Sequence, residues 1–229
     1  MTTRTTAPAD ARSDNTDRGA GDGARRYEGI NHLGKIFYIT GKSATGKDHI
    51  YEELISEKEP ELIPIVMYTT RPMRAGEKEG REYHFVDKAR LVAFREAGRI
   101  IEERTYHTVQ GDWHYFTADD GQIDLERGNY LAIGTLESYN GVRAFFGDGA
   151  MVPLYIESDA DVRLLRYISR EKKEEKPKYA EICRRFLADE ADYEEEKILE
   201  AGITKRFSNN GEFADCLREV KEYVREVCG

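Results

Sequence analysis

The chain of 229 residues has few cysteines, no long apolar run and no excess of positive charge. Its three cysteines, Cys183, Cys216 and Cys228, lack metal-ligand spacing, and their odd number fits poorly with a disulfide framework. Cys183 and Cys216 fall on the apolar faces of expected helices, which predicts buried thiols. No apolar run is long enough for a membrane helix, and none resembles the core of a signal peptide. These absences predict a cytoplasmic protein with no membrane partner.

The charge balance narrows the range of ligands. A net charge of −9 argues against a protein that coats polymeric nucleic acid by electrostatic attraction. One pocket can still be basic and bind a small nucleotide. Hydrophobic residues make up 39% of the chain and charged residues 34%, which suffices for a core beneath a charged surface. The sequence does not indicate an oligomeric state.

The chain divides into a polar tail and a folded part. Residues 1–33 are rich in Thr, Ala, Asp, Arg and Gly and contain little that could be buried. Such a segment cannot offset the entropy lost on ordering, so we expect it to be disordered. The remaining residues, 34–229, are expected to form the folded domain.

Apolar runs alternate with helical periodicity throughout the folded part. Strands that alternate with helices predict the α/β class, with a largely parallel sheet covered by helices on both faces. We expect strands at 36–40, 99–104, 130–135 and 151–157, and an extended apolar run at 62–67. We expect helices at 47–58, 87–97 and 136–146, from Asp159, at 179–193 and at 213–227.

The loop after the first strand carries the pattern G-x-x-x-x-G-K. Glycines in such a loop let successive N–H groups point inward onto phosphate oxygens, and the following helix adds its positive end. Lys47 is expected to reach the β- and γ-phosphates. The alternative is an ordinary strand-to-helix turn with a surface lysine. The strand before the loop and the helix after it favour a phosphate loop, whose residues are Gly41, Lys42, Ser43, Ala44, Thr45, Gly46 and Lys47.

A second basic stretch, "YTTRPMRAGEKEGREYHF", spans 68–85. Its residues Arg71, Arg74 and Tyr83 offer two guanidinium groups and one phenol, which together can enclose a phosphate. The alternative for isolated arginines is an exposed charged loop. This stretch resembles the monophosphate-binding region of guanylate kinases, whose typical form is S-T-T-R-x-P-R-x-G-E-x-x-G-x-x-Y-x-F. The matching residues are Thr69, Thr70, Arg71, Arg74, Gly76, Glu77, Gly80, Tyr83 and Phe85.

The resemblance extends over 34–228 and implies how the domain is organised. It implies a parallel-sheet P-loop kinase core at 34–67 and 131–229, a monophosphate-binding region at 68–130 and a lid at about 166–184. The implied reaction is ATP + GMP to ADP + GDP, assisted by Mg²⁺. The partners would be these small nucleotides and no polymeric nucleic acid.

The resemblance also implies roles for individual residues. ATP would be held by the phosphate loop, Asp48 and Asn209. Lys47, Arg166, Arg170 and Arg185 would stabilise the transferring phosphoryl group. We interpret Arg163, on the same helix face, as a solvated surface residue. GMP would be held by Thr70, Arg71, Arg74, Tyr83, Glu102, Tyr115 and Thr117, of which Glu102 and Thr117 would read the base.

The chain departs from the family pattern at four places. Tyr68 replaces a serine that helps to read the base, Phe116 replaces a glycine, and the strand at 132–135 lacks the family's D-x-D acids. Asp48 replaces the hydroxyl residue after the loop lysine. A carboxylate about 4 Å from a phosphate is repelled by about 4 kcal/mol unless a cation lies between them. We therefore hypothesise that Asp48 carries the Mg²⁺. The alternative is that Asp48 only caps the helix.

Two other functions are compatible with the same residues. The first is a kinase of this fold with a different monophosphate acceptor, which the changes at Tyr68 and Phe116 allow. The second is a non-catalytic guanylate-kinase-like module that binds phosphopeptides. Lys47 and the lid arginines favour an enzyme, because a binding module has no need of them.

Overall fold

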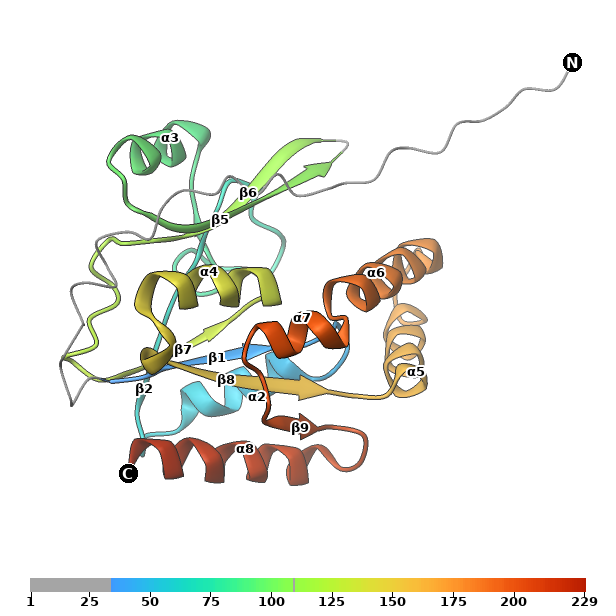
Figure 1. Ribbon diagram of the computed structural model, residues 1–229. Helices are drawn as coiled ribbons and strands as arrows, with labels where there is room; N and C mark the ends of the chain where they lie inside the picture. The colour runs from blue at the N-terminus through green and yellow to red at the C-terminus, as the bar shows by residue number, and fades with distance from the viewer. Residues whose placement is uncertain (1–33, 109) are drawn as a thin grey trace, which may run out of the picture. The chain divides into compact units, whose positions relative to one another are not determined.

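The computed structural model describes residues 34–108 and 110–229 (Figure 1). The tail that we expect to be disordered, 1–33, lies outside the described residues. The described chain forms two compact units, the smaller of which is Val66–Asp120. Residues 34–65 and Gly121–Gly229 form the larger one. Residues 121–130, which the sequence analysis grouped with the monophosphate-binding region, therefore belong to the larger unit.

The larger unit contains a five-stranded sheet in the order β2-β7-β1-β8-β9. All of its strand pairs are parallel, which confirms the predicted sheet type. The central strand β1 pairs Ile36 with Tyr130 on one side and with Met151 on the other. The edge strand β9 was not predicted. The strands are β1 (Ile36–Thr40), β2 (Leu62–Pro64), β7 (Asn129–Ile133), β8 (Met151–Glu157) and β9 (Arg206–Ser208).

Helices cover both faces of this sheet, as Figure 1 shows for α2 and α8 below it and α4 above it. Side chains of β1 alternate between the two faces. Phe37 and Ile39 join Ile50 of α2 and Val220 of α8 in one buried cluster. Burying a side chain of this size fully stabilises the fold by about 1.5–3 kcal/mol. The helices of this unit outside the lid are α2 (Lys47–Ser56), α4 (Leu136–Phe146), α7 (Glu195–Glu200) and α8 (Phe213–Cys228), with a 3-10 turn at Asp148–Ala150.

On the opposite face, Tyr38 fixes α4 to the sheet. Its hydroxyl donates to Oγ of Ser138 at 2.7 Å, and its ring meets that of Tyr139 edge-on with 5.5 Å between the ring centroids. Thr135 begins the helix, because its side chain accepts the N–H of Ser138. The carboxyl end of β7 therefore leads into a firmly capped helix.

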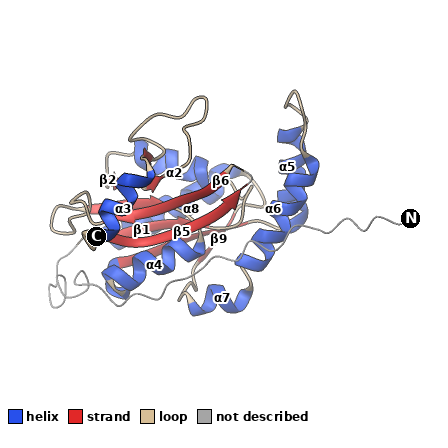
Figure 2. Cartoon of the chain, turned by 90° about the horizontal axis from the view of Figure 1, so that it is seen from above, coloured by secondary structure: helices blue, strands red, loops and turns tan. Residues whose placement is uncertain are grey.

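Two further helices, α5 (Ala160–Glu171) and α6 (Tyr179–Asp192), flank residues 172–178 in the region expected to form the lid. Figures 1 and 2 show them side by side beyond the carboxyl ends of β1 and β8. The buried residues of α5 are Arg163 and Tyr167, and that of α6 is Ile182. The lid thus rests on few buried side chains, and these are mostly polar or aromatic.

The cysteine predictions have different outcomes. Cys216 on α8 is buried, which confirms the prediction for that residue. Cys183 is exposed, so the prediction of a buried thiol there is wrong. The reason is that α6 buries one narrow edge, whereas its helical periodicity suggested a wide apolar face.

None of the helices in the described part of the chain is long and apolar enough to cross a lipid bilayer.

The smaller unit has a four-stranded sheet in the order β4-β3-β6-β5. Strands β5 and β6 form an antiparallel hairpin, and β3 pairs in parallel with β4. Its helix α3 begins at Asp87, whose side chain accepts the N–H of Arg90 at 2.8 Å. Strands β3, β4 and β6 were not predicted, and β5 runs past the predicted end at 104. The elements are β3 (Tyr68–Thr69), β4 (His84–Phe85), α3 (Lys88–Glu96), β5 (Ile100–Thr108) and β6 (Gly111–Ala118).

The two aromatic departures from the family pattern build the core of this unit. Tyr68 and Phe116 stack at 5.0 Å with an angle of 16° between their rings. Phe94 of α3 packs edge-on against both. The hydroxyl of Tyr68 donates to Asp120 at 2.5 Å. Tyr68 therefore serves the core, and its polar atom is engaged within the unit.

Candidate functional site

The loop between β1 and α2 has the backbone of an anion-binding nest. Ala44 has a φ of +66° and Gly46 a φ of +90°, and the left-handed conformation is uncommon for alanine. Gly41 has no room for a side chain, because a Cβ there would lie 2.2 Å from the carbonyl oxygen of Ile156. Alternation of conformation at successive residues turns their N–H groups to one side.

Four successive N–H groups of this loop are open. Within 34–108 and 110–229, no acceptor lies on the N–H groups of Ala44, Thr45, Gly46 or Lys47. The amino-terminal end of α2 follows them directly and adds its partial positive charge. Open donors at a helix start are a ready site for a phosphate.

Lys47 lies at the end of this row of donors. Its side chain is 17% exposed, and its Nζ is 4.0 Å from a carboxylate oxygen of Asp48. Burial lowers the pKa of Lys47, and the carboxylates of Asp48 and Asp189 oppose that shift. The charges of Arg185 and Arg163 lower the pKa further. A bound phosphate would supply the negative charge that this ammonium group needs.

Asn209 closes the loop from the side of β9. Its Nδ2 donates to the carbonyl oxygen of Thr45 at 2.7 Å, and the residue is 2% exposed. Its Oδ1 is buried with no hydrogen-bond partner in the described structure. Leaving such an acceptor unpaired costs about 1–3 kcal/mol.

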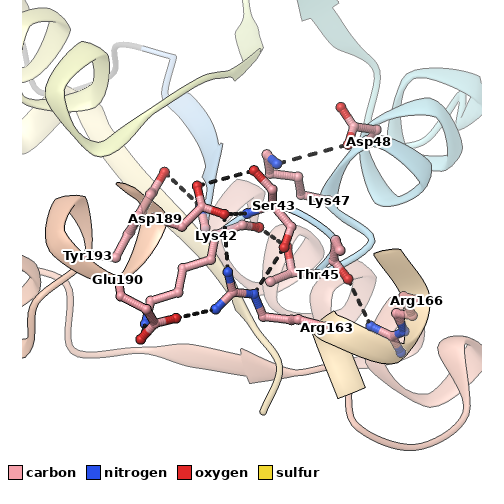
Figure 3. Close-up of polar contacts among 12 residues, drawn as sticks. Lys42, Ser43, Thr45, Lys47, Asp48, Arg163, Arg166, Asp189, Glu190 and Tyr193 are labelled. Carbon is pink, nitrogen blue, oxygen red and sulfur yellow. Dashed lines mark hydrogen bonds and ion pairs between the residues drawn. The ribbon is translucent and has the colours of Figure 1, made fainter. Parts of the chain in front are cut away.

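The first half of the loop is held by α6, as Figure 3 shows. The Nζ of Lys42 pairs with Glu190 at 2.7 Å. The N–H and hydroxyl of Ser43 donate to Asp189 at 2.8 and 3.2 Å. The sequence predicted that Lys42 and Ser43 contact ATP. In the structure their polar groups are directed to the two acids of α6.

Arg163 joins the same cluster, and our interpretation of it as a solvated residue is wrong. It is 1% exposed. Its Nε donates to the carbonyl oxygen of Ser43 at 3.0 Å, and its terminal nitrogens contact Glu190 at 2.6 Å and Asp189 at 3.1 Å (Figure 3). Its guanidinium also lies over the ring of Phe186 at 4.7 Å. Two carboxylates from a helix far along the chain explain its burial.

The three lid arginines of the prediction lie in two groups. Arg166 reaches the loop, where it donates to the carbonyl oxygens of Ala44 at 3.3 Å and Asn209 at 2.8 Å. Arg170 and Arg185 instead share the ring of Tyr167, at 5.3 and 5.9 Å from its centroid. Both are exposed. Their charged ends are thus available to a ligand, whereas Arg166 already supports the loop.

In the smaller unit, Arg71 is tightly bound by protein. It is 3% exposed and makes a two-pronged contact with Glu77 at 2.7 and 2.6 Å. Its other bonds go to the carbonyl oxygen of Pro72 and the hydroxyl of Tyr115, at 2.9 and 3.1 Å. The guanidinium holds the pKa of Glu77 at about 2, below its ordinary value.

Of the other predicted phosphate ligands, Tyr83 and Tyr115 lie beside the guanidinium of Arg71. The ring of Tyr83 lies 5.2 Å from the guanidinium of Arg71 and meets Tyr115 edge-on. Arg74 is exposed, and its N–H donates to Glu77. Thr70 bonds to β6 by accepting the N–H of His114 at 2.9 Å. The structure therefore brings Arg71, Tyr83 and Tyr115 together and leaves Arg74 at the surface.

Glu102 and Thr117, the predicted base readers, are also paired. The hydroxyl of Thr117 donates to Glu102 at 2.7 Å. Glu102 also contacts Arg104, whose Nε lies 3.0 Å from its carboxylate. A role for Arg104 was not predicted. Its signal was available, since residues two apart on a strand share a face.

Asp48, the hypothesised magnesium ligand, lies at the surface beside Lys47. Its carboxylate is 84% exposed, and among the described residues no backbone N–H donates to it. A helix-capping bond, the alternative role, is thus not observed. No group of three or more His, Cys, Asp or Glu in the described residues could hold a metal by itself. One carboxylate suffices where phosphates and water complete the octahedron of Mg²⁺.

Comparisons with known proteins find sequence and fold similarity to guanylate kinases. The family model described as "Guanylate kinase" matches residues 34–114. A guanylate kinase of Aromatoleum aromaticum is 42% identical over 74 residues, which are 32% of this chain and 36% of that protein. One from Helicobacter hepaticus is 28% identical over 139 residues, 60% of this chain and 68% of that protein. The chain thus spans about a third of the length of the first relative and two thirds of the second.

A crystal structure of guanylate kinase from Anaplasma phagocytophilum matches with a TM-score of 0.56 at 18% identity. The match covers 87% of this chain and 88% of that chain, and it shows the fold. The fold is that of the P-loop kinases, an α/β core built on a parallel sheet. In sequence over part of its length, and in fold, the chain is thus similar to guanylate kinases.

Proposed function

We propose that this protein is a nucleoside monophosphate kinase that transfers the γ-phosphoryl group of ATP to GMP. The observation that carries the proposal is the row of open N–H groups from Ala44 to Lys47, which ends on the half-buried ammonium group of Lys47. This arrangement suits the phosphates of a nucleoside triphosphate. The unpaired Oδ1 of Asn209 beside it suits the amino group of adenine.

In the proposed reaction, an oxygen of the acceptor phosphate attacks the γ-phosphorus of ATP. The bond from that phosphorus to the β,γ-bridging oxygen breaks, and ADP leaves with the electron pair. No general base is required, because the acceptor phosphate is already an oxyanion at neutral pH. The protein positions both substrates and balances charge, which is the main contribution to catalysis of phosphoryl transfer.

Each charged residue has a proposed task. Lys47 stabilises the β- and γ-phosphates, and the exposed guanidiniums of Arg170 and Arg185 approach the transferring group. Arg166 holds the loop through two carbonyl oxygens. Asp48 would hold Mg²⁺, which when bound neutralises charge on the phosphates of ATP.

The smaller unit provides the proposed acceptor site. Tyr83 and Tyr115 carry hydroxyls next to the guanidinium of Arg71, and Glu77 fixes that guanidinium in place. Arg74 supplies a second, exposed positive charge. These groups suit a phosphate monoester.

A steady-state assay of ADP release tests the proposal. The purified full chain is given ATP and Mg²⁺ with GMP, dGMP, AMP, CMP or UMP in parallel. We expect turnover with GMP, and loss of at least a hundredfold in Lys47→Met. An exposed lysine, Lys58→Met, serves as the matched control. If no monophosphate supports turnover while a phosphopeptide binds, the chain is a binding module and the proposed reaction is wrong.

A further inference from the structure

Strand β5 carries a buried ion pair at the place proposed for base recognition. The side chains of Glu102 and Arg104 are 5% and 6% exposed. The Nε of Arg104 lies 3.0 Å from one carboxylate oxygen, and a terminal nitrogen lies 3.4 Å from the other. Both side chains leave the same face of the strand because they are two residues apart.

A third donor reaches the same carboxylate from the neighbouring strand. Thr117 lies opposite Glu102 in the register of β5 and β6. Its hydroxyl donates to Oε1 of Glu102 at 2.7 Å. A carboxylate has about four lone-pair sites. Donors of the protein therefore occupy at least three of the four at Glu102 before any ligand binds.

This occupancy limits what Glu102 can read. Guanine presents two adjacent donors, N1–H and the 2-amino group, whereas hypoxanthine presents N1–H alone. A carboxylate with at least three sites taken cannot accept both guanine donors while it keeps Arg104 and Thr117. Tyr68, which stands where the family has a base-reading serine, does not supply the missing contact to guanine, because its hydroxyl donates to Asp120.

Selectivity against a base that lacks a donor comes from leaving a buried polar group unpaired. In this pocket a base without the 2-amino group leaves Glu102 paired, because Arg104 balances its charge. The loss of binding free energy when hypoxanthine takes the place of guanine is therefore small. Arg104 also keeps the pocket neutral when no base is present.

We propose that Arg104 is a specificity-determining residue that widens the acceptor class to 6-oxopurine monophosphates with or without the 2-amino group. The proposal rests on the proposed function, because it takes Glu102 as the base reader. The two acceptors it equates are GMP and IMP. Removing Arg104 frees acceptor sites on Glu102 and sharpens the preference for guanine.

The test compares kcat/KM for GMP and IMP in the parent, in Arg104→Met and in Arg104→Lys. We expect the parent to prefer GMP by less than about tenfold. Arg104→Met should raise this ratio at least fivefold. Arg104→Lys, which keeps the charge but offers fewer directed donors, should fall between the two. If thermal unfolding shows that Arg104→Met does not fold, the test compares the parent with Arg104→Lys instead.

A matched control comes from the same unit. Arg95 also pairs with a glutamate of β5, Glu103, at a more exposed position. Arg95→Met should leave the ratio of GMP to IMP unchanged. A parent ratio above tenfold, or a ratio that does not rise on removing Arg104, overturns the proposal.

Calorimetric titration of GMP and IMP without ATP separates this proposal from the proposed function. If the parent binds both nucleotides with similar affinity but forms no ADP, the reaction is wrong and the assignment of Arg104 stands. If ADP forms with GMP while IMP neither binds nor reacts, the reaction stands and the assignment of Arg104 fails. If neither nucleotide binds, both fail.

Discussion

Arg163 donates from its Nε to the carbonyl oxygen of Ser43 at 3.0 Å and so ties the lid helix α5 to the phosphate loop. The same guanidinium holds Asp189 and Glu190 of α6, which in turn hold Ser43 and Lys42. The loop is thereby divided in function. Its first half anchors the lid, and its second half keeps four N–H groups open to a ligand.

Replacing Arg163 should therefore damage both stability and ATP binding. Arg163→Met leaves Asp189 and Glu190 without their buried partner. Because Glu190 is 40% exposed and keeps Lys42, the cost should lie below the roughly 3–5 kcal/mol of a fully buried pair. We expect a lower free energy of unfolding in urea and weaker ATP binding by calorimetry. The triple variant Arg163→Met, Asp189→Asn, Glu190→Gln should recover much of the stability. Arg184→Met removes an exposed pair instead and should have little effect.

Asn209 should select the base of the phosphoryl donor. Asn209→Ala removes the unpaired buried acceptor, so we expect ATP to bind about tenfold more weakly, a loss of about 1.4 kcal/mol. GTP presents an oxygen where ATP presents its amino group, so its affinity should change less. Calorimetric titration of both nucleotides measures this difference. Equal losses for ATP and GTP would mean that Asn209 only supports the loop through Thr45.

The strand, loop and helix at 36–56 could be predicted because all of their signals are local. The apolar run of β1 and the glycine pattern lie within twenty residues. The strands β3 and β4 could not be predicted, since two residues each are too few to show alternation. Their existence depends on pairing with residues far along the chain.

The candidate site also contains both contacts that depend on residues far along the chain and contacts with a local signal in the sequence. The bond from Ser43 to Asp189 joins residues 146 positions apart, so helical spacing alone could not reveal why Arg163 is buried. Arg104 differs, because its position two residues after Glu102 already places both on one face of a strand. That pair could therefore have been predicted from the sequence, although only Glu102 was.

Asp48 should affect ATP binding in opposite directions with and without metal. Asp48→Asn removes a carboxylate beside the proposed phosphate site, and with it a repulsion of up to about 4 kcal/mol if the charges are about 4 Å apart. Metal-free ATP should therefore bind more tightly than to the parent. The Mg²⁺ concentration that half-saturates turnover should rise about tenfold. Titration of EDTA-treated protein with ATP, and of activity with Mg²⁺, measures the two effects. If neither changes, Asp48 is not the metal ligand.

Acid should loosen the smaller unit through Glu77. Because Arg71 depresses the pKa of Glu77 from 4.5 to about 2, the folded unit favours the ionised form more than the unfolded chain does. This contribution to stability is complete above about pH 4.5 and is lost as the pH falls towards 2. Glu77→Gln should weaken this unit at neutral pH and flatten its loss of stability between those pH values. Amide hydrogen exchange of β6, measured from pH 5 to pH 3 and corrected for the intrinsic rate, follows the unit directly.

Glu96→Gln, an exposed change in the same unit, should leave the acid profile as in the parent. If Glu77→Gln and the parent lose protection in parallel as the pH falls, the ion pair does not set the acid limit of this unit.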